Sequence, residues 1–311
     1  MSGQEKKRLV VIVGPTGIGK SRTGLELASE YDGEIVSADS RQVYVYMDIG
    51  TAKPGPEEQA LVPHHVIDII NPDEDFSLAC YQELATAAIE DIHHRGRLPF
   101  LVGGSGLYVW AVVDGWQIPR VPPDDELRRS LEKQAAEGGV DGLYRELTRI
   151  DPATARRIDP RNVRRVIRAL EVSRSTSIPL SELRNRQVPP YDTLVIGLTG
   201  DRQEVYRRTD ARVDSMIERG MVEEVRKLVG MGYGSAAPVV SGIGYRQISM
   251  YLNGEFSLTE AIGQIKTETH RLVRHQNSWF RSEDGRIHWF DVDKEPEPEI
   301  RALTGSFCGL T

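Results

Sequence analysis

Residues 11–21, "VIVGPTGIGKS", join an apolar run to a helical pattern. The run ends at Gly14, and the helical pattern extends from Arg22 to about Tyr31. The spacing G-x-x-x-x-G-K-S between a predicted strand and a predicted helix is typical of a phosphate-binding loop. Glycines allow backbone conformations in which successive N–H groups point at an anion, and the helix N-terminus adds partial positive charge. The stretch therefore predicts binding of a polyphosphate.

Two side chains of this loop carry specific chemistry. Lys20 adds a full positive charge, and the Ser21 hydroxyl is suitably placed to help bind Mg²⁺. The alternative, a glycine-rich turn that only joins two elements, leaves Lys20 without a role. The loop does not distinguish ATP from a diphosphate ester. The predicted phosphate-binding residues are Gly14, Pro15, Thr16, Gly17, Ile18, Gly19, Lys20 and Ser21, with Ser21 as the predicted magnesium ligand.

The bulk composition is that of an ordinary globular protein. Of 311 residues, 39% are hydrophobic and 27% are charged. No apolar run approaches the roughly 20 residues that span a bilayer, and the first residues lack the apolar stretch of a signal peptide. We expect a cytoplasmic protein with no membrane contact. Cys80 and Cys308 lie far apart and are expected to be free thiols.

The positive charge is concentrated in one part of the chain. The net charge of −7 argues against a generally basic nucleic-acid binder, but binding follows local patches. The tail "DVDKEPEPE" is expected to be a solvated acidic segment. Between Ala155 and Thr176 the chain carries Arg156, Arg157, Arg161, Arg164, Arg165, Arg168 and Arg174.

The order of the predicted elements indicates an α/β fold with an insertion. "RLVVIVG", "EIVSAD" and "LPFLVGG" alternate with helical patterns, as in a parallel sheet with crossover helices. Residues 117–192 have helical patterns only, and a strand pattern returns at 193–201. We therefore predict a P-loop NTPase-like parallel sheet with flanking helices, formed by 1–116 and 193–311, and a small inserted helical domain at 117–192.

The C-terminal part is expected to be largely helical, with helices at 202–219 and 257–282 and a final strand, "RIHWFDV". In the long helix one stripe is predicted to be core: Ile262, Ile265, Thr269, Leu272, Gln276 and Trp279. Another face carries Arg271, Arg274, His275 and Arg281. That face is either a solvated basic surface or a nucleic-acid contact.

The residues that follow two predicted strands indicate the type of reaction. Asp39 follows the second predicted strand at the sheet edge where ligands bind, so it could accept a proton from an incoming nucleophile. The alternative is an Asp that caps a helix or turn. After the next strand, where a typical nucleotide hydrolase has Asp, the chain has Gly103, Gly104 and Ser105. These residues suit close approach to a leaving group, although glycines also occur at tight strand-to-helix turns.

At this point the sequence resembles the tRNA dimethylallyltransferases of the IPP transferase family. The resemblance covers nearly the whole chain, and "MDIGTAKP" together with "RALEV" is far more specific than a phosphate loop. The matching motifs, in order, are "GPTGIGKS", "SADSRQVY", "MDIGTAKP", "VPHHVIDI", "GGSGLY", "RRVIRALEV", "DRQEVYRR", "GIGYRQ" and "QNSWFR".

The resemblance implies that the loop holds dimethylallyl diphosphate. The acceptor would be the exocyclic amine of the adenine immediately 3′ of a tRNA anticodon. Lys20, the loop amides, Mg²⁺ on Ser21 and Ser105 would neutralise the leaving diphosphate, and Asp39 would take the proton. Arg208 and Arg212 are further candidates for gripping the diphosphate, with Arg212 favoured. The catalytic residues are thus expected to be Asp39, Ser105, Lys20 and Arg212.

The resemblance also implies contacts with the tRNA anticodon stem-loop. The adenine must leave its stack and enter a pocket. No protein partner is evident, and nothing requires more than a monomer. The tRNA-binding residues implied are Asp39, Ser40, Arg41, Gln42, Arg164, Arg165, Val166, Ile167, Arg168, Gly244, Tyr245, Arg246, Gln247 and Arg274.

The chain departs from the family pattern at a few positions. Val45 and Tyr46 precede Met-Asp where the family usually has Lys-Gly or Arg-Gly. His270 and His275 stand where the family has arginines, which predicts that tRNA affinity falls above about pH 6.5.

Two other functions stay open. One is a small-molecule or nucleoside kinase with Asp39 as base, and the other is a non-catalytic RNA-binding protein with a nucleotide-gated loop.

Overall fold

A computed structural model describes residues 7–118, 121, 124–176, 179–183 and 191–309. The chain forms two compact units, which are described separately. Unit 1 comprises Met1–Val113 and Pro189–Thr311, and unit 2 comprises Asp114–Val188. None of the helices in the described ranges combines the length and the apolar character that a membrane span requires.

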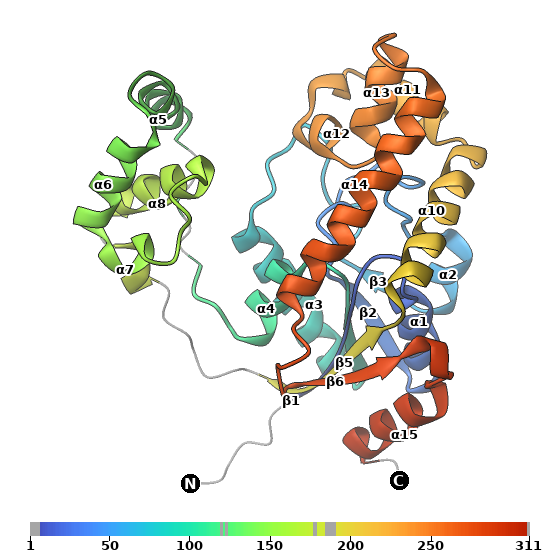
Figure 1. The fold of residues 1–311 in the computed structure, drawn as a ribbon. Coiled ribbons are helices and arrows are strands. Elements are labelled where there is room, and N and C mark those ends of the chain that lie inside the picture. The colour runs from blue at the N-terminus through green and yellow to red at the C-terminus, as the bar shows by residue number, and fades with distance from the viewer. Residues whose placement is uncertain (1–6, 119–120, 122–123, 177–178, 184–190, 310–311) are drawn as a thin grey trace, which may run out of the picture. The chain divides into compact units, whose positions relative to one another are not determined.

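Unit 1 is built on a parallel six-stranded sheet, so the predicted fold class is confirmed (Figure 1). The strand order is β3-β2-β4-β1-β5-β6, which puts β1 between β4 and β5. In register, Val10 lies opposite Phe100 and Leu194. The strands are β1 (Lys7–Val13), β2 (Gly33–Ser37), β3 (His64–His65), β4 (Leu98–Val102), β5 (Tyr191–Thr199) and β6 (Ile287–Asp291).

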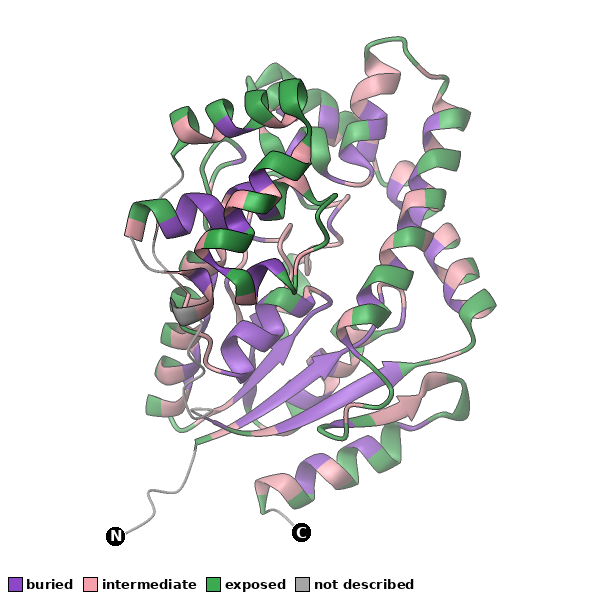
Figure 2. Ribbon diagram, turned by 60° about the vertical axis from the view of Figure 1, so that its left-hand side comes forward, coloured by how far each residue is buried: buried purple, intermediate pink, exposed green. Residues whose placement is uncertain are grey.

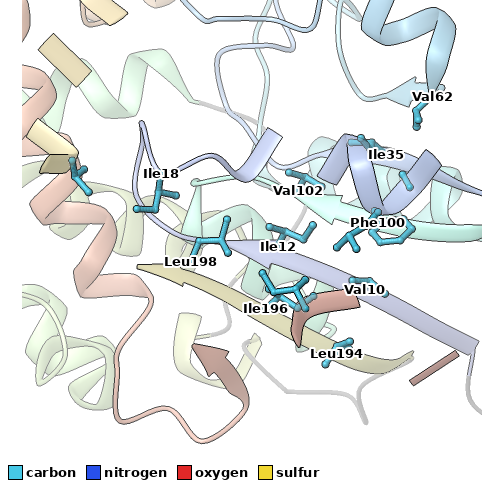
Figure 3. Close-up of a cluster of buried hydrophobic side chains, with 14 of the residues drawn as sticks. Val10, Ile12, Ile18, Ile35, Val62, Phe100, Val102, Leu194, Ile196 and Leu198 are labelled. Atoms are coloured by element: carbon cyan, nitrogen blue, oxygen red, sulfur yellow. The ribbon is translucent and has the colours of Figure 1, made fainter. Parts of the chain in front are cut away.

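The central strands are apolar on both faces because helices cover each side. In Figure 2 these strands are buried along most of their length. Val10, Ile12, Ile35 and Phe100 pack with side chains of α1 (Lys20–Glu30) in one core cluster, part of which Figure 3 shows. On β2 and β4, helix α3 (Leu78–His94) also packs, beside α4 (Gly106–Val113). A sheet buried on both faces leaves its carboxyl edge as the place for a ligand.

A helical layer continues unit 1 beyond that edge. Helix α14 lies alongside α10 and α13 (Figure 1). Their core includes Met47, Val225, Tyr245 and Ile265. The remaining helices of unit 1 are α2 (Pro56–Leu61), α10 (Arg202–Glu218), α11 (Met221–Gly230), η1 (Tyr233–Ser235), α12 (Ala237–Ser241), α13 (Tyr245–Leu252), α14 (Leu258–Trp279), η2 (Val292–Lys294) and α15 (Glu297–Cys308).

The regular elements in the described part of unit 2 are helices. Leu131, Leu147, Val166 and Leu170 form its core. Glu171 is fully buried there and pairs with Arg128 and Arg168. Its helices are α5 (Asp125–Gly138), α6 (Val140–Ile150), α7 (Pro152–Ala155), α8 (Val163–Thr176) and α9 (Leu180–Leu183).

Some sequence predictions need correction. The strand predicted at 193–201 is β5 and begins at Tyr191. The last described helix of the predicted helical insertion is α9 (Leu180–Leu183), and residues 184–190 lie outside the described ranges. The acidic tail is mostly exposed, as predicted, but its last residues form the first turn of α15, a helix that the sequence did not predict. Ile300 and Thr304 are buried on one face of α15, whereas the repeated Glu and Pro residues at its start indicate only a solvated acidic segment. Cys80 and Cys308 are free thiols, as predicted.

Candidate active site

The phosphate loop lies between β1 and α1, as the sequence predicts. Gly14, Gly17 and Gly19 have φ values of 145°, 83° and 104°, which side chains rarely adopt. A Cβ at Gly17 would lie 2.6 Å from the Thr209 methyl carbon of α10. The glycines therefore permit both the curvature of the loop and its close packing against α10.

Three charged side chains converge beside this loop. Burial, then repulsion from Arg212, lowers the pKa of Lys20 to about 7, while Asp39 partly offsets this effect. Burial also lowers the pKa of Arg212, again opposed by Asp39. Among the described residues, Arg212 has no hydrogen bond or ion pair partner within bonding distance, so its guanidinium can take an anionic ligand. Lys20, Arg212 and Asp39 thus lie near enough at the carboxyl edge of the sheet to influence one another's charge.

Lys20 is held by the loop itself. Its ammonium Nζ donates to the carbonyl oxygen of Pro15 at 2.7 Å. This bond keeps the side chain over the loop. A lysine with a lowered pKa beside an arginine stabilises an added anion by regaining its proton.

The Asp39 loop is tied to the loop after β4. The Ser105 hydroxyl accepts from the Ser40 amide at 3.1 Å, and the Ser105 amide donates to the Ala38 carbonyl at 3.1 Å. Asp39 itself accepts from the Arg41 amide at 2.8 Å. Ser105 is therefore next to Asp39, where it fixes the backbone on both sides of the carboxylate.

Sequence reasoning missed an aromatic pair beneath Asp39. The rings of Tyr81 and Tyr108 stack with centroids 3.8 Å apart. The Tyr81 hydroxyl donates to the Ser37 carbonyl at 3.1 Å. Burial raises the pKa of both tyrosines, and Asp39 adds to the effect, so both hydroxyls stay protonated. No local motif marks Tyr81 in the sequence, and only the fold brings it near Asp39.

Gly103 and Gly104, which follow β4, pack closely against other parts of the protein. A Cβ at Gly103 would lie 2.2 Å from the Ala38 carbonyl oxygen, and one at Gly104 would lie 2.2 Å from the Gln276 amide nitrogen. The space that these glycines leave is filled by protein atoms. These contacts by themselves require glycine at both positions, and close approach to a leaving group stays a prediction.

Gln276 is the second residue that sequence reasoning missed, because its helical stripe indicated core. It is 7% exposed, on α14. Its Oε1 accepts from the Thr16 amide at 2.7 Å, and its Nε2 donates to the Gly104 carbonyl at 3.2 Å. The predicted stripe is partly right, since Ile265, Thr269 and Gln276 are buried, but Ala261 and Val273 complete it.

Arg208 is engaged elsewhere. Its guanidinium pairs with Glu204 at 2.9 Å and with Asp293 at 2.8 Å. Arg212, one turn further along α10, has no such pair among the residues that the structure describes. Of the two arginines, Arg212 is the better candidate for a diphosphate ligand.

The motif "MDIGTAKP" forms a loop held by α11. Glu224 accepts from the amides of Asp48 at 3.1 Å, Ile49 at 2.7 Å and Gly50 at 3.1 Å. The Tyr245 hydroxyl donates to the same carboxylate at 2.7 Å. The Lys53 side chain is 3% exposed and pairs with Asp48 at 2.6 Å. These contacts give the motif a structural role.

The residues implied for RNA in unit 1 differ in exposure. Arg246 and Arg274 are exposed, and Ser40, Arg41 and Gln42 are half-buried. Tyr245 and Gln247 are buried, and the Gln247 side chain accepts from the Gly244 amide at 2.9 Å. Direct side-chain contact with RNA is not supported at these two positions, because their polar atoms face the protein interior.

The His270 departure is explained by local contacts. His270 Nε2 lies 2.8 Å from Asp210 Oδ1, and its ring stacks on Tyr206 with centroids 4.0 Å apart. Arg274 donates to the Tyr206 hydroxyl at 3.0 Å, and His275 is exposed. His270 thus binds within the protein, whereas His275 is exposed to a ligand.

Unit 2 divides its implied RNA residues in the same way. Val166 and Ile167 are core residues, 0% and 5% exposed, so their side chains cannot reach RNA. Arg168 pairs with Glu171 and donates to the Val121 carbonyl. Arg164 and Arg165 are exposed, and neither guanidinium has an ion pair within the part of the chain that the structure describes. These two arginines are the free cations of α8.

The site has a limited set of metal ligands. In the described part of the chain, no three His, Cys, Asp or Glu side chains are grouped to hold a metal ion. Ser21 is exposed in the first turn of α1. Mg²⁺ keeps several waters and often takes its remaining ligands from substrate phosphates, so one hydroxyl beside a bound diphosphate fits it.

The IPP transferase family model matches residues 42–283, and the isopentenyl transferase model matches residues 7–63. The chain belongs to the IPP transferase family. Among curated members, a tRNA dimethylallyltransferase of Roseiflexus sp. (strain RS-1) is 55% identical over 88% of this chain and 90% of its own.

Solved structures of the family have the same fold. The tRNA isopentenylpyrophosphate transferase of Bacillus halodurans matches with a TM-score of 0.72 and 43% identity, over 97% of each chain. A eukaryotic dimethylallyltransferase described as acting on tRNA matches with a TM-score of 0.79 and 28% identity. That match covers 96% of this chain and 78% of the other.

Proposed function

We propose that this chain transfers a dimethylallyl group from dimethylallyl diphosphate to tRNA and releases diphosphate. The acceptor is the exocyclic amine of the adenine that follows the anticodon. The function of the curated relatives supports the reaction class. The observation that carries the mechanism is the convergence of Lys20, Arg212 and Asp39 beside the phosphate loop.

The loop amides, Lys20 and Arg212 bind the diphosphate and hold its negative charge. In the reaction a carbon–nitrogen bond forms at the allylic carbon, and the carbon–oxygen bond to the diphosphate breaks. The bonding pair leaves with the diphosphate oxygen. Because that oxygen gains charge in the transition state, cations that lie against it lower the barrier.

Asp39 takes the proton that the amine loses. Ser105 positions Asp39 through its bonds to Ser40 and Ala38. Because its hydroxyl acts as an acceptor in the bond to Ser40, its proton can be donated to the leaving diphosphate, the role expected for Ser105. Ser21 would hold Mg²⁺, which when bound supplies further positive charge to the diphosphate. Arg208 is left as a less favoured diphosphate ligand, because it is already paired with two carboxylates.

The tRNA is held by exposed arginines, which contact phosphates without reading sequence. On unit 2 these are Arg164 and Arg165, and on unit 1 they include Arg246 and Arg274. Arg41 follows Asp39 and is proposed to contact the target base. The Gln42 side chain is a weaker candidate, because it accepts from the Ser37 hydroxyl at 2.9 Å and donates to the Ala52 carbonyl at 3.2 Å. An inserted helical domain that binds the anticodon stem is part of this proposal. It corresponds to unit 2, Asp114–Val188, and not to the predicted range 117–192, because β5 of unit 1 begins at Tyr191.

The test is a mass measurement on unmodified tRNA. The tRNA carries adenine 3′ of the anticodon and is incubated with the protein, Mg²⁺ and either dimethylallyl diphosphate or ATP. We expect a gain of one prenyl unit on that adenine with the allylic diphosphate alone. ATP consumption without any gain in mass would contradict the proposal and favour a kinase.

A further inference from the structure

One peptide unit of the phosphate loop is fixed at both of its polar atoms. The carbonyl of Pro15 accepts from Lys20 Nζ at 2.7 Å, and the amide of the next residue, Thr16, donates to Gln276 Oε1 at 2.7 Å. The carbonyl and the amide belong to the same planar group, so they turn together. Whatever orients the Thr16 amide also orients the carbonyl that holds Lys20.

The orientation of the Gln276 side chain is determined by its partners. Its oxygen faces an N–H donor, and its nitrogen faces the Gly104 carbonyl at 3.2 Å. A flipped amide would put oxygen against oxygen and N–H against N–H. Gly104 lacks a Cβ where the Gln276 nitrogen lies. The loop after β4 therefore locks the side chain in the orientation that serves the phosphate loop.

We propose that Gln276 is a positioning residue for diphosphate binding, because it fixes the Pro15–Thr16 peptide and thereby the ammonium of Lys20. This inference rests on the proposed function and adds to it a residue on α14, distant in sequence from the loop. The arrangement also takes the Thr16 amide away from the ligand. The diphosphate is then bound by the amides that follow Thr16.

Two substitutions separate this role from ordinary packing. Gln276→Met keeps the volume and removes both hydrogen bonds, so we expect the Kd and KM for dimethylallyl diphosphate to rise roughly tenfold. The KM for tRNA should stay within twofold. Gln276→Glu can imitate the amide only while its carboxyl is protonated, since the acid then accepts from Thr16 and donates to Gly104.

The decisive measurement is the Kd for dimethylallyl diphosphate, by titration calorimetry, from pH 5.5 to 8.5. At each pH the Kd of a variant is divided by the Kd of the wild type. For Gln276→Glu this ratio should rise with pH, until it approaches or exceeds the same ratio for Gln276→Met. Gln82→Glu is the matched control, because Gln82 also donates to a backbone carbonyl, that of Ala111, away from the loop. Its ratio should not change with pH.

A flat ratio for Gln276→Glu, or an unchanged Kd for Gln276→Met, would overturn the inference. So would an equal rise in both KM values together with a lower thermal midpoint, since that is the effect of a residue that only packs. The calorimetry does not require turnover. A wild-type protein that binds the diphosphate but does not alkylate tRNA would refute the proposed function, and the Kd ratios would still decide the role of Gln276.

Discussion

The ammonium of Lys20 is shielded from water and lies near Arg212, and both effects favour its neutral form. With a pKa of about 7 in the free protein, Lys20 must take up a proton to bind an anion strongly above that pH. We expect the affinity for dimethylallyl diphosphate to fall as pH rises above 7, by at most about tenfold per unit. Calorimetry between pH 6.5 and 8.5 measures this, and an affinity independent of pH would contradict it.

Lys20→Met provides a second test at the same residue. It removes the proposed charge-assisted hydrogen bond to dimethylallyl diphosphate, so the affinity for that ligand should drop roughly 10- to 100-fold and lose its pH dependence above 7.

The same variant tests the effect of Lys20 on stability. The unfolded chain binds more protons at Lys20 than the folded one between pH 7 and 10.5, so this lysine costs stability in the free protein at neutral pH. The thermal midpoint of Lys20→Met should therefore equal or exceed that of the wild type. A lower midpoint would show that the ammonium stabilises the fold.

Asp39→Asn tests the proton acceptor. An amide cannot take the proton, so kcat should fall by roughly 10²- to 10⁴-fold. The Kd for tRNA should stay within a fewfold, because the side chain keeps its shape and its bond to the Arg41 amide. Single-turnover rates and filter binding separate the two effects. Loss of tRNA binding with an unchanged rate at saturation would assign Asp39 to RNA recognition instead.

At the scale of elements, one carboxylate of α11 holds a whole loop. Glu224 accepts from three consecutive amides and from the Tyr245 hydroxyl. Glu224→Gln should lower the free energy of unfolding by about 1 to 3 kcal/mol, since hydrogen bonds to a charged group are replaced or lost. Glu223→Gln is the matched control, because its exposed pair with Arg226 contributes little. Equal effects in denaturant unfolding would contradict this role of Glu224.

Elements were predictable from the sequence where the pattern was strong. The buried strands, α1, α3 and the helices of unit 2 follow from apolar periodicity and from the glycines of the loop. Helix α15 was missed because a Glu- and Pro-rich start masks its apolar face. The site was predictable at Lys20, Ser21 and Asp39, which are recognisable from a local motif or a strand end. Gln276, Tyr81 and Glu224 were not, because their partners are distant in sequence and only the fold brings them together.

At the scale of the whole molecule, unit 2 carries exposed arginines on a chain with a net charge of −7. If Arg164 and Arg165 each contact an RNA phosphate, replacing both with glutamine should weaken tRNA binding and reduce the slope of log affinity against log salt by about 1 per contact. The Kd for dimethylallyl diphosphate should not change. Arg161→Gln is the control, because Arg161 already pairs with Asp159. If the slope of log affinity against log salt is the same in the double variant as in the wild type, Arg164 and Arg165 do not contact RNA phosphates.

The order in which the chain is synthesised gives the bond between Thr16 and Gln276 another consequence. The phosphate loop leaves the ribosome early. Strand β5, which pairs with β1, begins only at Tyr191, and Gln276 is synthesised later still. A nascent chain that ends before α14 contains the loop glycines and Lys20, but it lacks the Gln276 side chain that fixes the Pro15–Thr16 peptide. Completion of the diphosphate site therefore waits for nearly the whole polypeptide, so truncated products of interrupted translation should be poor competitors for the prenyl donor.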